Sequence, residues 1–425
     1  MKVFVIGGGG REHAIAWKLA RRAGVTQVYA SPGNPGIARV AECLPAASSS
    51  PRDLLAVADS VGADLTVVGP EAPLVAGVVD SFQAAGKKIV GPTAAAAQLE
   101  GSKIFAKRFM DRHGLPTARF ITVETREAAR KSLPRFDFPV VIKADGLAAG
   151  KGVIICRTPE EAESALKGMF SGELVGAAGS RLVIEEFLEG EEVSFIALSD
   201  GRNVVPLEPT QDHKAIYDGD RGPNTGGMGA YCDSRILAPE QAARIMETII
   251  SPAVNGMAED GTPFAGFLYA GLMMTSSGPK LLEFNVRLGD PETQGLMLRM
   301  DSDFAAMLHA AASGDLAGVK PAWRPEPSVC VVMAAPGYPG KVRTGDRIEG
   351  IEQAEEQGAV VFHAGTRMGP QGLETAGGRV LGVTASGRDL ADAIGNAYRA
   401  VDCIRFDGAQ YRRDIGRKGL KRYNG

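Results

Sequence analysis

The amino-acid sequence predicts an α/β protein, α+β overall, that is built from several domains. Three observations support this fold class. In the first hundred residues, short β-branched strands alternate with helical stretches, as in proteins with a parallel sheet. Toward the end of the chain, strands follow one another with few helices between them. The chain has 425 residues, of which 44% are hydrophobic and 23% charged, so it can form large cores without disulfides or zinc.

Residues 1–103 are expected to form an N-terminal domain around a parallel sheet. The alternation of strands and helices places the ligand-binding loops of such a sheet at the carboxyl ends of its strands. The predicted strands cover residues 2–6, 27–30, 64–68 and 88–90, and the predicted helices cover 11–22, 51–61 and 72–85.

Three further parts are expected after this domain. A small subdomain of residues 120–189, which we expect to move as a lid, interrupts a central domain of 104–119 and 190–324. A proline-rich linker at 321–327 leads into a β-rich domain of 325–425. The predicted strands are 120–122, 140–143, 153–156, 182–187, 193–198, 204–207, 266–275, 280–285, 329–334, 360–364 and 379–386, and the predicted helices are 103–113, 158–169, 301–312 and 390–401.

Charge and cysteine content exclude several classes of function. Lys and Arg number 47 against 50 Asp and Glu, and the net charge of −3 gives no general attraction to nucleic acid or anionic membranes. The five cysteines form no CxxC pair, so a zinc ribbon or dithiol site is not expected. No apolar stretch has the length of a membrane span or signal peptide. We therefore expect a cytoplasmic protein without nucleic-acid or membrane partners and without a fused second enzyme.

A run of glycines, Gly7–Gly10, separates the first strand from the first helix. The run does not fit the GxGxxG pattern of dinucleotide-binding folds, and the second strand ends without the acidic residue that would bind a ribose. The free N–H groups of the helix N-terminus suit a phosphate or carboxylate, and a simple tight turn is the alternative. Glycine-containing polar loops at 31–36 and 69–73 end the next two strands, which favours one shared pocket.

Residues 140–152 combine a strand, Lys143, a glycine-rich loop, Lys151 and a second strand. The loop is not a Walker A motif, because Gly146 and Gly150 are one residue too close. Lysines beside such a loop can neutralise a polyphosphate, and closure of the loop would exclude water from it. The alternative is a mobile hairpin with two solvated lysines.

Residues 182–192 form an apolar strand that runs into acidic residues. An adenosine needs a hydrogen-bond acceptor for its amino group, an apolar slot and a carboxylate for its ribose. Glu185, Leu188 and Glu192 (or Glu191) can supply these groups. A solvated acidic turn is the alternative.

Residues 280–287 form a predicted strand with polar residues at every second position. Glu283, Asn285 and Arg287 should therefore share one face, with Leu282 and Phe284 buried on the other. Two oxygen ligands beside phosphates suit Mg²⁺, and an adjacent guanidinium can stabilise a phosphoryl group in transfer. A polar edge strand without a ligand is the alternative.

Two further segments contain residues that could contact a substrate. Residues 211–214 are charged, and residues 222–230 are a glycine-rich loop whose N–H groups could face a phosphate or a small carboxylate. The five histidines show no metal-ligand spacing. His213 is open to a role in the site or to a surface hydrogen bond.

In this order, the motifs resemble the glycinamide ribonucleotide synthetase family of the ATP-grasp superfamily, over nearly the whole chain. The resemblance implies a Rossmann-like N-terminal domain, an ATP-grasp core of two subdomains and a β-rich C-terminal domain. Gly8 stands where the family commonly has Asn. The segments that carry the resemblance are GGGGREHA (7–14), VVGPEAPL (67–74), QLEGSK (98–103), VIKADGLAAGKGV (141–153), VIEEFLEGEEVSF (183–195), QDHK (211–214), GPNTGGMGAY (222–231), GFLYAGLM (266–273), LEFNVRLGDPET (282–293) and VVMAAPGYPG (331–340).

The resemblance implies an ATP-dependent ligase of de novo purine biosynthesis. ATP would convert glycine to glycyl phosphate, and the amine of 5-phosphoribosylamine would attack it to give glycinamide ribonucleotide, ADP and phosphate. Its expected partners are therefore small molecules, and we expect a monomer. Three alternatives stay open: another ATP-grasp ligase such as a carboxylase, a dinucleotide-dependent oxidoreductase, and a nucleotide-binding scaffold without activity.

The resemblance also implies roles for individual residues. Arg287 and Lys143 are expected to act in catalysis, and Glu283 and Asn285 to hold Mg²⁺ or Mn²⁺. The preceding strand, 264–275, has no acidic residue that could serve as a second metal ligand. The residues expected to bind ATP are Lys103, Lys143, Gly150, Lys151, Glu185, Glu186, Leu188 and Glu192. Those expected to bind glycine or phosphoribosylamine are Gly9, Gly10, Asn34, Glu71, Asp212, Lys214, Gly227, Arg287, Asp290 and Pro291.

Overall fold

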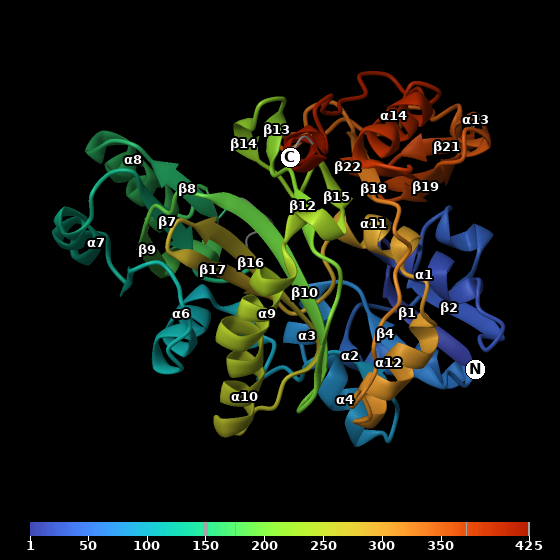
Figure 1. Cartoon of the computed structure of the whole chain (residues 1–425), viewed down its shortest axis with the longest axis horizontal. Coiled ribbons are helices and arrows are strands. Elements are labelled where there is room, and N and C mark those ends of the chain that lie inside the picture. Colours follow the sequence, from blue (N-terminus) through green and yellow to red (C-terminus); the bar gives the residue numbers. More distant parts are fainter. Residues whose placement is uncertain (148–151, 175, 371, 424–425) are drawn as a thin grey trace.

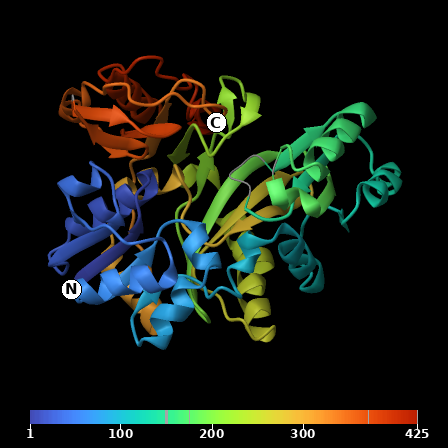
Figure 2. The same cartoon turned by 180° about the vertical axis from the view of Figure 1, so that it is seen from behind.

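Figure 1 shows the computed structural model of the chain, whose structure is described for residues 1–147, 152–174, 176–370 and 372–423. A small part with helices α7 (Arg126–Ser132) and α8 (Pro159–Phe170) projects from one end of a long central sheet. The N-terminal part (blue) and the C-terminal part (orange to red) lie at the other end. The view from behind in Figure 2 shows these two parts side by side.

The N-terminal part contains a five-stranded parallel sheet in the order β3-β2-β1-β4-β5. Its central strand is entirely apolar from Val3 to Ile6 and buried on both faces, as expected when helices cover both sides. The predicted helix 72–85 is wrong, because Gly77 has a φ of +85° and divides it into two helices. The strands are β1 (Lys2–Gly7), β2 (Gln27–Pro32), β3 (Glu42–Cys43), β4 (Leu65–Val68) and β5 (Ile89–Val90), and the helices are α1 (Gly10–Ala20), α2 (Pro51–Val61), α3 (Glu71–Val75) and α4 (Val78–Ala84).

The projecting part, which we call the lid, is a four-stranded antiparallel sheet in the order β6-β9-β7-β8, with α7 and α8 packed on it. It has a hydrophobic core of its own that includes Phe136, Ile142 and Leu166. A separate core allows such a part to move as one body. Its strands are β6 (Phe120–Val123), β7 (Val140–Ala144), β8 (Val153–Cys156) and β9 (Leu182–Glu186).

A nine-stranded sheet connects the central residues to the C-terminal part. Its order is β17-β16-β10-β12-β15-β18-β22-β19, with β11 paired to β10. The C-terminal strands were predicted, but the pairing of β15 with β18, which continues the central sheet into them, was not. The strands are β10 (Glu191–Asp200), β11 (Val204–Pro206), β12 (Thr210–Asp212), β15 (Gly229–Cys232), β16 (Ala265–Thr275), β17 (Gly278–Asn285), β18 (Ser328–Ala334), β19 (Val360–His363) and β22 (Arg379–Ser386).

Helices and two hairpins complete the described chain. Helix α6 (Lys103–Arg112) begins at Ser102, whose hydroxyl accepts a hydrogen bond from the Phe105 N–H. No described helix is long and apolar enough to cross a membrane. The other helices are α5 (Gln98–Gly101), α9 (Pro239–Ile245), α10 (Ser251–Glu259), α11 (Glu292–Arg299), α12 (Phe304–Ser313), α13 (Ile351–Glu356) and α14 (Leu390–Val401), and the hairpins are β13 (Ala215–Tyr217) with β14 (Arg221–Asn224) and β20 (Thr366–Gly369) with β21 (Gly372–Thr375).

Strand β17 contains a β-bulge at Leu282, the one residue without a partner between the paired Leu281 and Glu283. The bulge places Leu282 against Leu188, whereas Phe284 lies in the main hydrophobic core. The prediction that Leu282 and Phe284 share one apolar face is therefore wrong, because an inserted residue interrupts the two-residue alternation.

Two buried histidines join the N-terminal and C-terminal parts, and we predict that they destabilise the fold in acid. The His363 N–H donates to His13 Nδ1 (2.8 Å), and burial lowers the pKa of His13 to about 3 and that of His363 to about 4. Because these values lie below the unfolded value near 6.5, the unfolded chain binds more protons. Stability is therefore complete above pH 6.5 and falls below it, by about 2 kcal/mol per histidine at pH 5.

This prediction is checked by thermal unfolding at pH 7.5 and pH 5.0. The melting temperature of the unchanged chain should fall more on acidification than that of His13→Gln, whose side chain does not titrate. An equal fall in both proteins would contradict the assignment to this pair.

Candidate functional site

Two lysines meet at the junction of the lid and the central sheet. Lys143 on β7 forms an ion pair with Glu185 Oε2 (3.0 Å) and donates to the Leu282 carbonyl oxygen (3.1 Å). Lys103 begins α6 and donates to the Gly146 carbonyl oxygen (3.2 Å), and burial lowers its pKa. The structure thus brings both predicted phosphate ligands to one place. Gly150 and Lys151 lie outside the described residues.

An apolar cluster lies next to these lysines. Leu188 packs there with Ala118 and Met273, and Leu282 covers the cluster from β17. The carboxylate of Glu186 accepts a hydrogen bond from the Arg119 N–H (2.9 Å). The cluster has the apolar character that the sequence analysis expected around an adenine.

Two neighbouring glutamates on β10, Glu191 and Glu192, have different partners. Glu191 is held by Lys421 (2.9 Å) and Arg422 (2.6 Å) from the C-terminal segment. Glu192 pairs with Lys214 (2.8 Å), and this partner lowers the pKa of the Glu192 carboxyl. Successive side chains of a strand point to opposite faces. Of the two acids that the sequence left open, Glu192 therefore lies on the face of the predicted site.

Glu283 and Arg287 occupy a strongly charged part of the site. Burial would raise the pKa of Glu283, but the charges of Lys214, Lys143, Lys103 and Arg287 outweigh burial and lower it. The guanidinium of Arg287 donates to the Asn285 side-chain oxygen (3.1 Å). Glu283, Asn285 and Arg287 are thus together in space, but Arg287 lies beyond the end of β17 at Asn285, so the prediction that one strand carries all three is wrong.

Two carboxylates hold Arg287 from the N-terminal side of the site. Glu100 on α5 contacts Arg287 Nη2 (2.7 Å) and also accepts the Val286 N–H (2.7 Å), while Glu71 contacts Arg287 Nε (3.3 Å). Burial raises the pKa of Glu100, although the charge of Arg287 opposes that change. Two acids therefore orient Arg287 in the site. The sequence analysis named Glu71 as a site residue but did not name Glu100.

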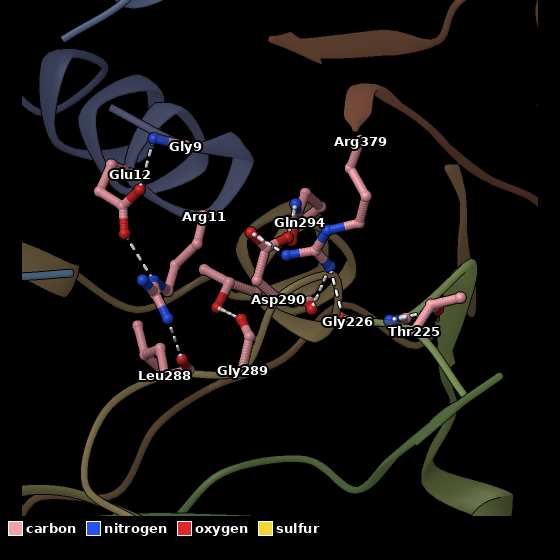
Figure 3. Close-up of polar contacts among 12 residues, drawn as sticks. Gly9, Arg11, Glu12, Thr225, Gly226, Leu288, Gly289, Asp290, Gln294 and Arg379 are labelled. Atoms are coloured by element: carbon pink, nitrogen blue, oxygen red, sulfur yellow. Dashed lines mark hydrogen bonds and ion pairs between the residues drawn. The ribbon is translucent and has the colours of Figure 1, made fainter. Parts of the chain in front are cut away.

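The turn after β17 is connected to the C-terminal part by Arg379 (Figure 3). Arg379 begins β22 and contacts Asp290 Oδ2 (3.0 Å), and it also donates to the carbonyl oxygens of Asp290 and Gly226 (both 2.6 Å). Burial would raise the pKa of Asp290, but Arg379 and Arg11 lower it. A Cβ added at Gly227 would lie only 2.6 Å from Pro291 Cδ, so the glycine loop lies directly against this turn.

The start of α1 faces the same turn, as Figure 3 also shows. The Gly9 N–H donates to Glu12 Oε2 (2.6 Å), and Arg11 donates to the Leu288 carbonyl oxygen (3.1 Å). A Cβ added at Gly10 would lie 3.7 Å from Asp290 Oδ1. Gly9 and Gly10 therefore lie close to Asp290, with which they were predicted to bind one substrate.

The side chain of Asn34 connects loops of the N-terminal and C-terminal parts. Its amide nitrogen donates to the carbonyl oxygens of Gly8 (2.9 Å) and His363 (2.8 Å), and its oxygen accepts the Ile37 N–H (2.9 Å). Both N–H bonds of the amide are thus used within the protein. Its predicted contact with substrate stays a prediction.

Asp212, His213 and Lys214 leave β12 beside Glu192. Burial raises the pKa of Asp212, whereas Lys214 has a raised pKa because Glu192 and Asp212 outweigh its own burial. His213 lies between the Gly229 carbonyl oxygen and the Gly416 N–H, and burial lowers its pKa to about 3. The alternative of a surface hydrogen bond for His213 is wrong, since only 2% of the residue is exposed.

Sequence reasoning did not single out several charged residues of this site. Glu100 and Glu292 lie inside segments that carried the resemblance, but no local pattern indicates which cation or hydroxyl each one meets. Lys107 follows Lys103 by one helical turn, a spacing that places both on one face of α6. No local sequence pattern indicated a role for Arg379, because its partners lie in a different part of the chain.

We predict that Arg379→Met weakens the binding of one substrate without affecting the other. Loss of the guanidinium leaves the partly buried Asp290 carboxylate without its ion-pair partner and separates the turn from Gly226. If the turn binds phosphoribosylamine, as the resemblance implies, the KM for that substrate should rise about tenfold, while the KM for ATP stays within about twofold. Steady-state kinetics with each substrate varied in turn check this result.

Arg367→Met is the matched control, since this arginine of the same C-terminal part pairs with Glu374 and is exposed. It should leave both KM values unchanged. A parallel rise in both constants for Arg379→Met would contradict a local effect on the Asp290 turn.

Among the described residues, Glu283 and Asn285 are the candidate ligands for a divalent metal. The described part of the chain contains no group of three or more His, Cys, Asp or Glu side chains that could hold a metal by themselves. Glu283 and Asn285 supply two oxygen donors, which suits Mg²⁺ because this ion takes few protein ligands and completes its shell with water and phosphate oxygens.

Comparisons with known proteins agree with this geometry. Residues 1–100, 101–293 and 328–418 match the models of the N domain, the ATP-grasp (A) domain and the C domain of phosphoribosylglycinamide synthetase. The chain belongs to the phosphoribosylglycinamide synthetase family. The predicted resemblance and fold class are confirmed.

Relatives of similar length support this membership. The phosphoribosylamine–glycine ligase of Xylella fastidiosa is 52% identical over 426 residues, which cover 99% of this chain and 97% of that protein. The protein of the same name from Pseudomonas aeruginosa is 50% identical over 431 residues, with full coverage of both chains.

Solved structures show the same fold. The crystal structure of phosphoribosylamine–glycine ligase from Thermotoga maritima has a TM-score of 0.86 and 36% identity, covering 98% of this chain and 100% of that one. The biotin carboxylase domain of Hydrogenobacter thermophilus 2-oxoglutarate carboxylase has a TM-score of 0.75 at 18% identity, covering 100% and 95%. That second likeness concerns the fold alone, so it gives no support to the carboxylase alternative.

Proposed function

We propose that this chain joins glycine to 5-phosphoribosylamine at the expense of ATP, through glycyl phosphate, in purine biosynthesis. Family membership over the whole chain supports the reaction. One structural observation carries the assignment of the site. Lys103 and Lys143 both lie near Glu283, beside Arg287 and the Asp290 turn.

In the first step, a glycine carboxylate oxygen attacks the γ-phosphorus of ATP. A new P–O bond forms, the bond to the β–γ bridging oxygen breaks, and ADP leaves. Lys103 and Lys143 neutralise the phosphates, and Arg287 stabilises the charge of the phosphoryl group in transfer. Because the substrate itself is the nucleophile, the protein contributes positioning and charge.

Glu283 and Asn285 would hold the metal, with Mg²⁺ the ion that their two oxygens suit best and Mn²⁺ the alternative. When bound, such an ion neutralises charge on the β- and γ-phosphates. The absence of an acid on β16 fits a site in which water and phosphate oxygens complete the ligand set.

In the second step, the amine of phosphoribosylamine attacks the carbonyl carbon of glycyl phosphate. A C–N bond forms, the C–O bond to phosphate breaks, and the nitrogen loses a proton. Gly9, Gly10, Glu71, Asp290 and Pro291 are proposed to position phosphoribosylamine. Asp212, Lys214 and Gly227, which lie between this turn and Glu192, are proposed to position glycine.

The adenosine is proposed to lie on the apolar cluster of Leu188, with Glu185 and Glu186 near its base and Glu192 near its ribose. Residues 120–189 are then the lid over the nucleotide, and their separate core supports movement as one body. The other predicted boundaries, 1–103, 104–119 with 190–324, and 325–425, are retained as the proposed domain division.

Omission of single substrates tests this function. Phosphate release is measured with ATP, Mg²⁺, glycine and freshly prepared phosphoribosylamine, and again with each component left out. Release should require all four. Release that persists without glycine would overturn the substrate assignment. The cytoplasmic setting and the monomeric state remain part of the proposal, and sedimentation in solution tests the latter.

A further inference from the structure

Lys107 is a buried lysine for which the proposed reaction has no role. It lies on α6 with only 2% of the residue exposed. Its Nζ atom lies 3.2 Å from Glu185 Oε1 and donates to Thr117 Oγ1 (2.7 Å). Burying a lysine is costly unless its charge is paired, so this position needs an explanation.

The Glu185 carboxylate is shared between two lysines. Lys107 lies at Oε1, and Lys143 lies at Oε2 (3.0 Å). Glu185 is 1% exposed, so water screens neither pair. Without Lys107, the full negative charge of Glu185 would act on Lys143 alone.

A count of charges shows what Lys107 changes. At Glu185, two cations, Lys107 and Lys143, face one carboxylate, so this group of three has one positive charge in excess. Removal of Lys107 leaves Lys143 as the one cation paired with Glu185. Lys143 would then have to leave an unneutralised Glu185 in order to meet an incoming triphosphate.

We propose that Lys107 is a positioning residue for ATP: it neutralises Glu185 and thereby leaves Lys143 free to bind the phosphates. This inference rests on the proposed role of Lys143. Lys107 itself lies on α6 and donates to Thr117, whose hydroxyl donates in turn to the Leu281 carbonyl oxygen (2.6 Å). It therefore acts through Glu185 and has no contact of its own with the reacting atoms.

A double-mutant cycle tests this proposal, with the Kd of ATP·Mg²⁺ measured by calorimetry. Lys107→Met should raise the Kd at least tenfold in the unchanged background. In the Glu185→Gln background, where the negative charge is already absent, the same substitution should raise the Kd less than threefold. Lys107→Arg, which keeps the charge, should stay within threefold of the unchanged protein. A purely structural role for Lys107 would weaken ATP binding equally in both backgrounds.

Equal changes in the two backgrounds, or an unchanged Kd for Lys107→Met, would overturn the proposal. Lys131→Met is the matched control, because that lid lysine forms an exposed pair with Glu127. If Lys107→Met does not fold, the same cycle is run with Lys107→Gln, which can still donate to Thr117. Lys143→Met is measured in parallel. An unchanged Kd for this variant would overturn the proposed role of Lys143. If its Kd is raised, a negative result for Lys107→Met overturns only the proposed role of Lys107.

Discussion

Arg287→Lys is expected to lower kcat by roughly 10²- to 10³-fold, or about 3–4 kcal/mol of transition-state stabilisation. Lysine keeps the charge but loses the planar fork of donors. In the structure that fork contacts Glu100 (2.7 Å) and Glu71 (3.3 Å), and it lies beside Asn285 (3.1 Å). A point charge cannot hold both acids and also face the phosphoryl group. Single-turnover kinetics with saturating ATP and glycine measure this loss directly.

Arg299→Lys is the control for Arg287→Lys. The Arg299 side chain is more deeply buried than that of Arg287 (2% against 17% exposed) and contacts Glu208 (2.7 Å) and main-chain carbonyl oxygens, but it lies at the far end of α11 from the Asp290 turn. It should lower the melting temperature without a comparable loss of kcat. If both substitutions reduce kcat alike, general destabilisation explains the effect and the role of Arg287 fails.

Glu283→Gln is expected to lower kcat/KM for ATP by roughly 10²-fold, or about 2.7 kcal/mol, and to raise the Mg²⁺ concentration needed for half-maximal rate. The amide is a weaker ligand for a hard cation than the carboxylate. The substitution also removes the acid on which Lys103, Lys143 and Lys214 converge, so these cations repel one another in the empty site. Initial rates over a series of Mg²⁺ concentrations check both effects.

Two observations would argue against a metal-binding role for Glu283. One is a lower kcat/KM with an unchanged Mg²⁺ requirement, which would indicate loss of electrostatic balance alone. The other is a similar shift in the Mg²⁺ requirement for Glu208→Gln, whose carboxylate pairs with Arg299 in another part of the fold.

Much of the fold could be predicted from local patterns. The alternation of strands and helices before residue 103 is clear because β1 is apolar from Val3 to Ile6, β4 has three apolar residues out of four, and the helices have clear starts and ends. The antiparallel strands of the lid and of β10, β16 and β17 were also evident. The sequence analysis did not predict the two-residue strand β3 or the helices α7, α9, α10 and α11, and Gly77 divides one expected helix.

Even within one strand, local patterns predicted some features and missed others. The two-residue period of β17 predicted the positions of Glu283 and Asn285 relative to each other. The bulge at Leu282 was not visible, because it is a feature of the pairing of β17 with β16, which lies outside the pattern of one strand. That bulge decides that Leu282 belongs to the apolar cluster of Leu188.

The sequence by itself determined which chemical groups are available and in what order: two lysines, a strand that runs into acidic residues, a Glu-x-Asn strand and several glycine loops. Only the tertiary structure decided which charge meets which. Glu100 with Arg287, Asp290 with Arg379 and Glu185 with Lys107 are pairs from distant parts of the chain. The physical reason is that periodicity and turn chemistry act over a few residues, whereas the partner of a buried charge depends on how sheets and helices pack.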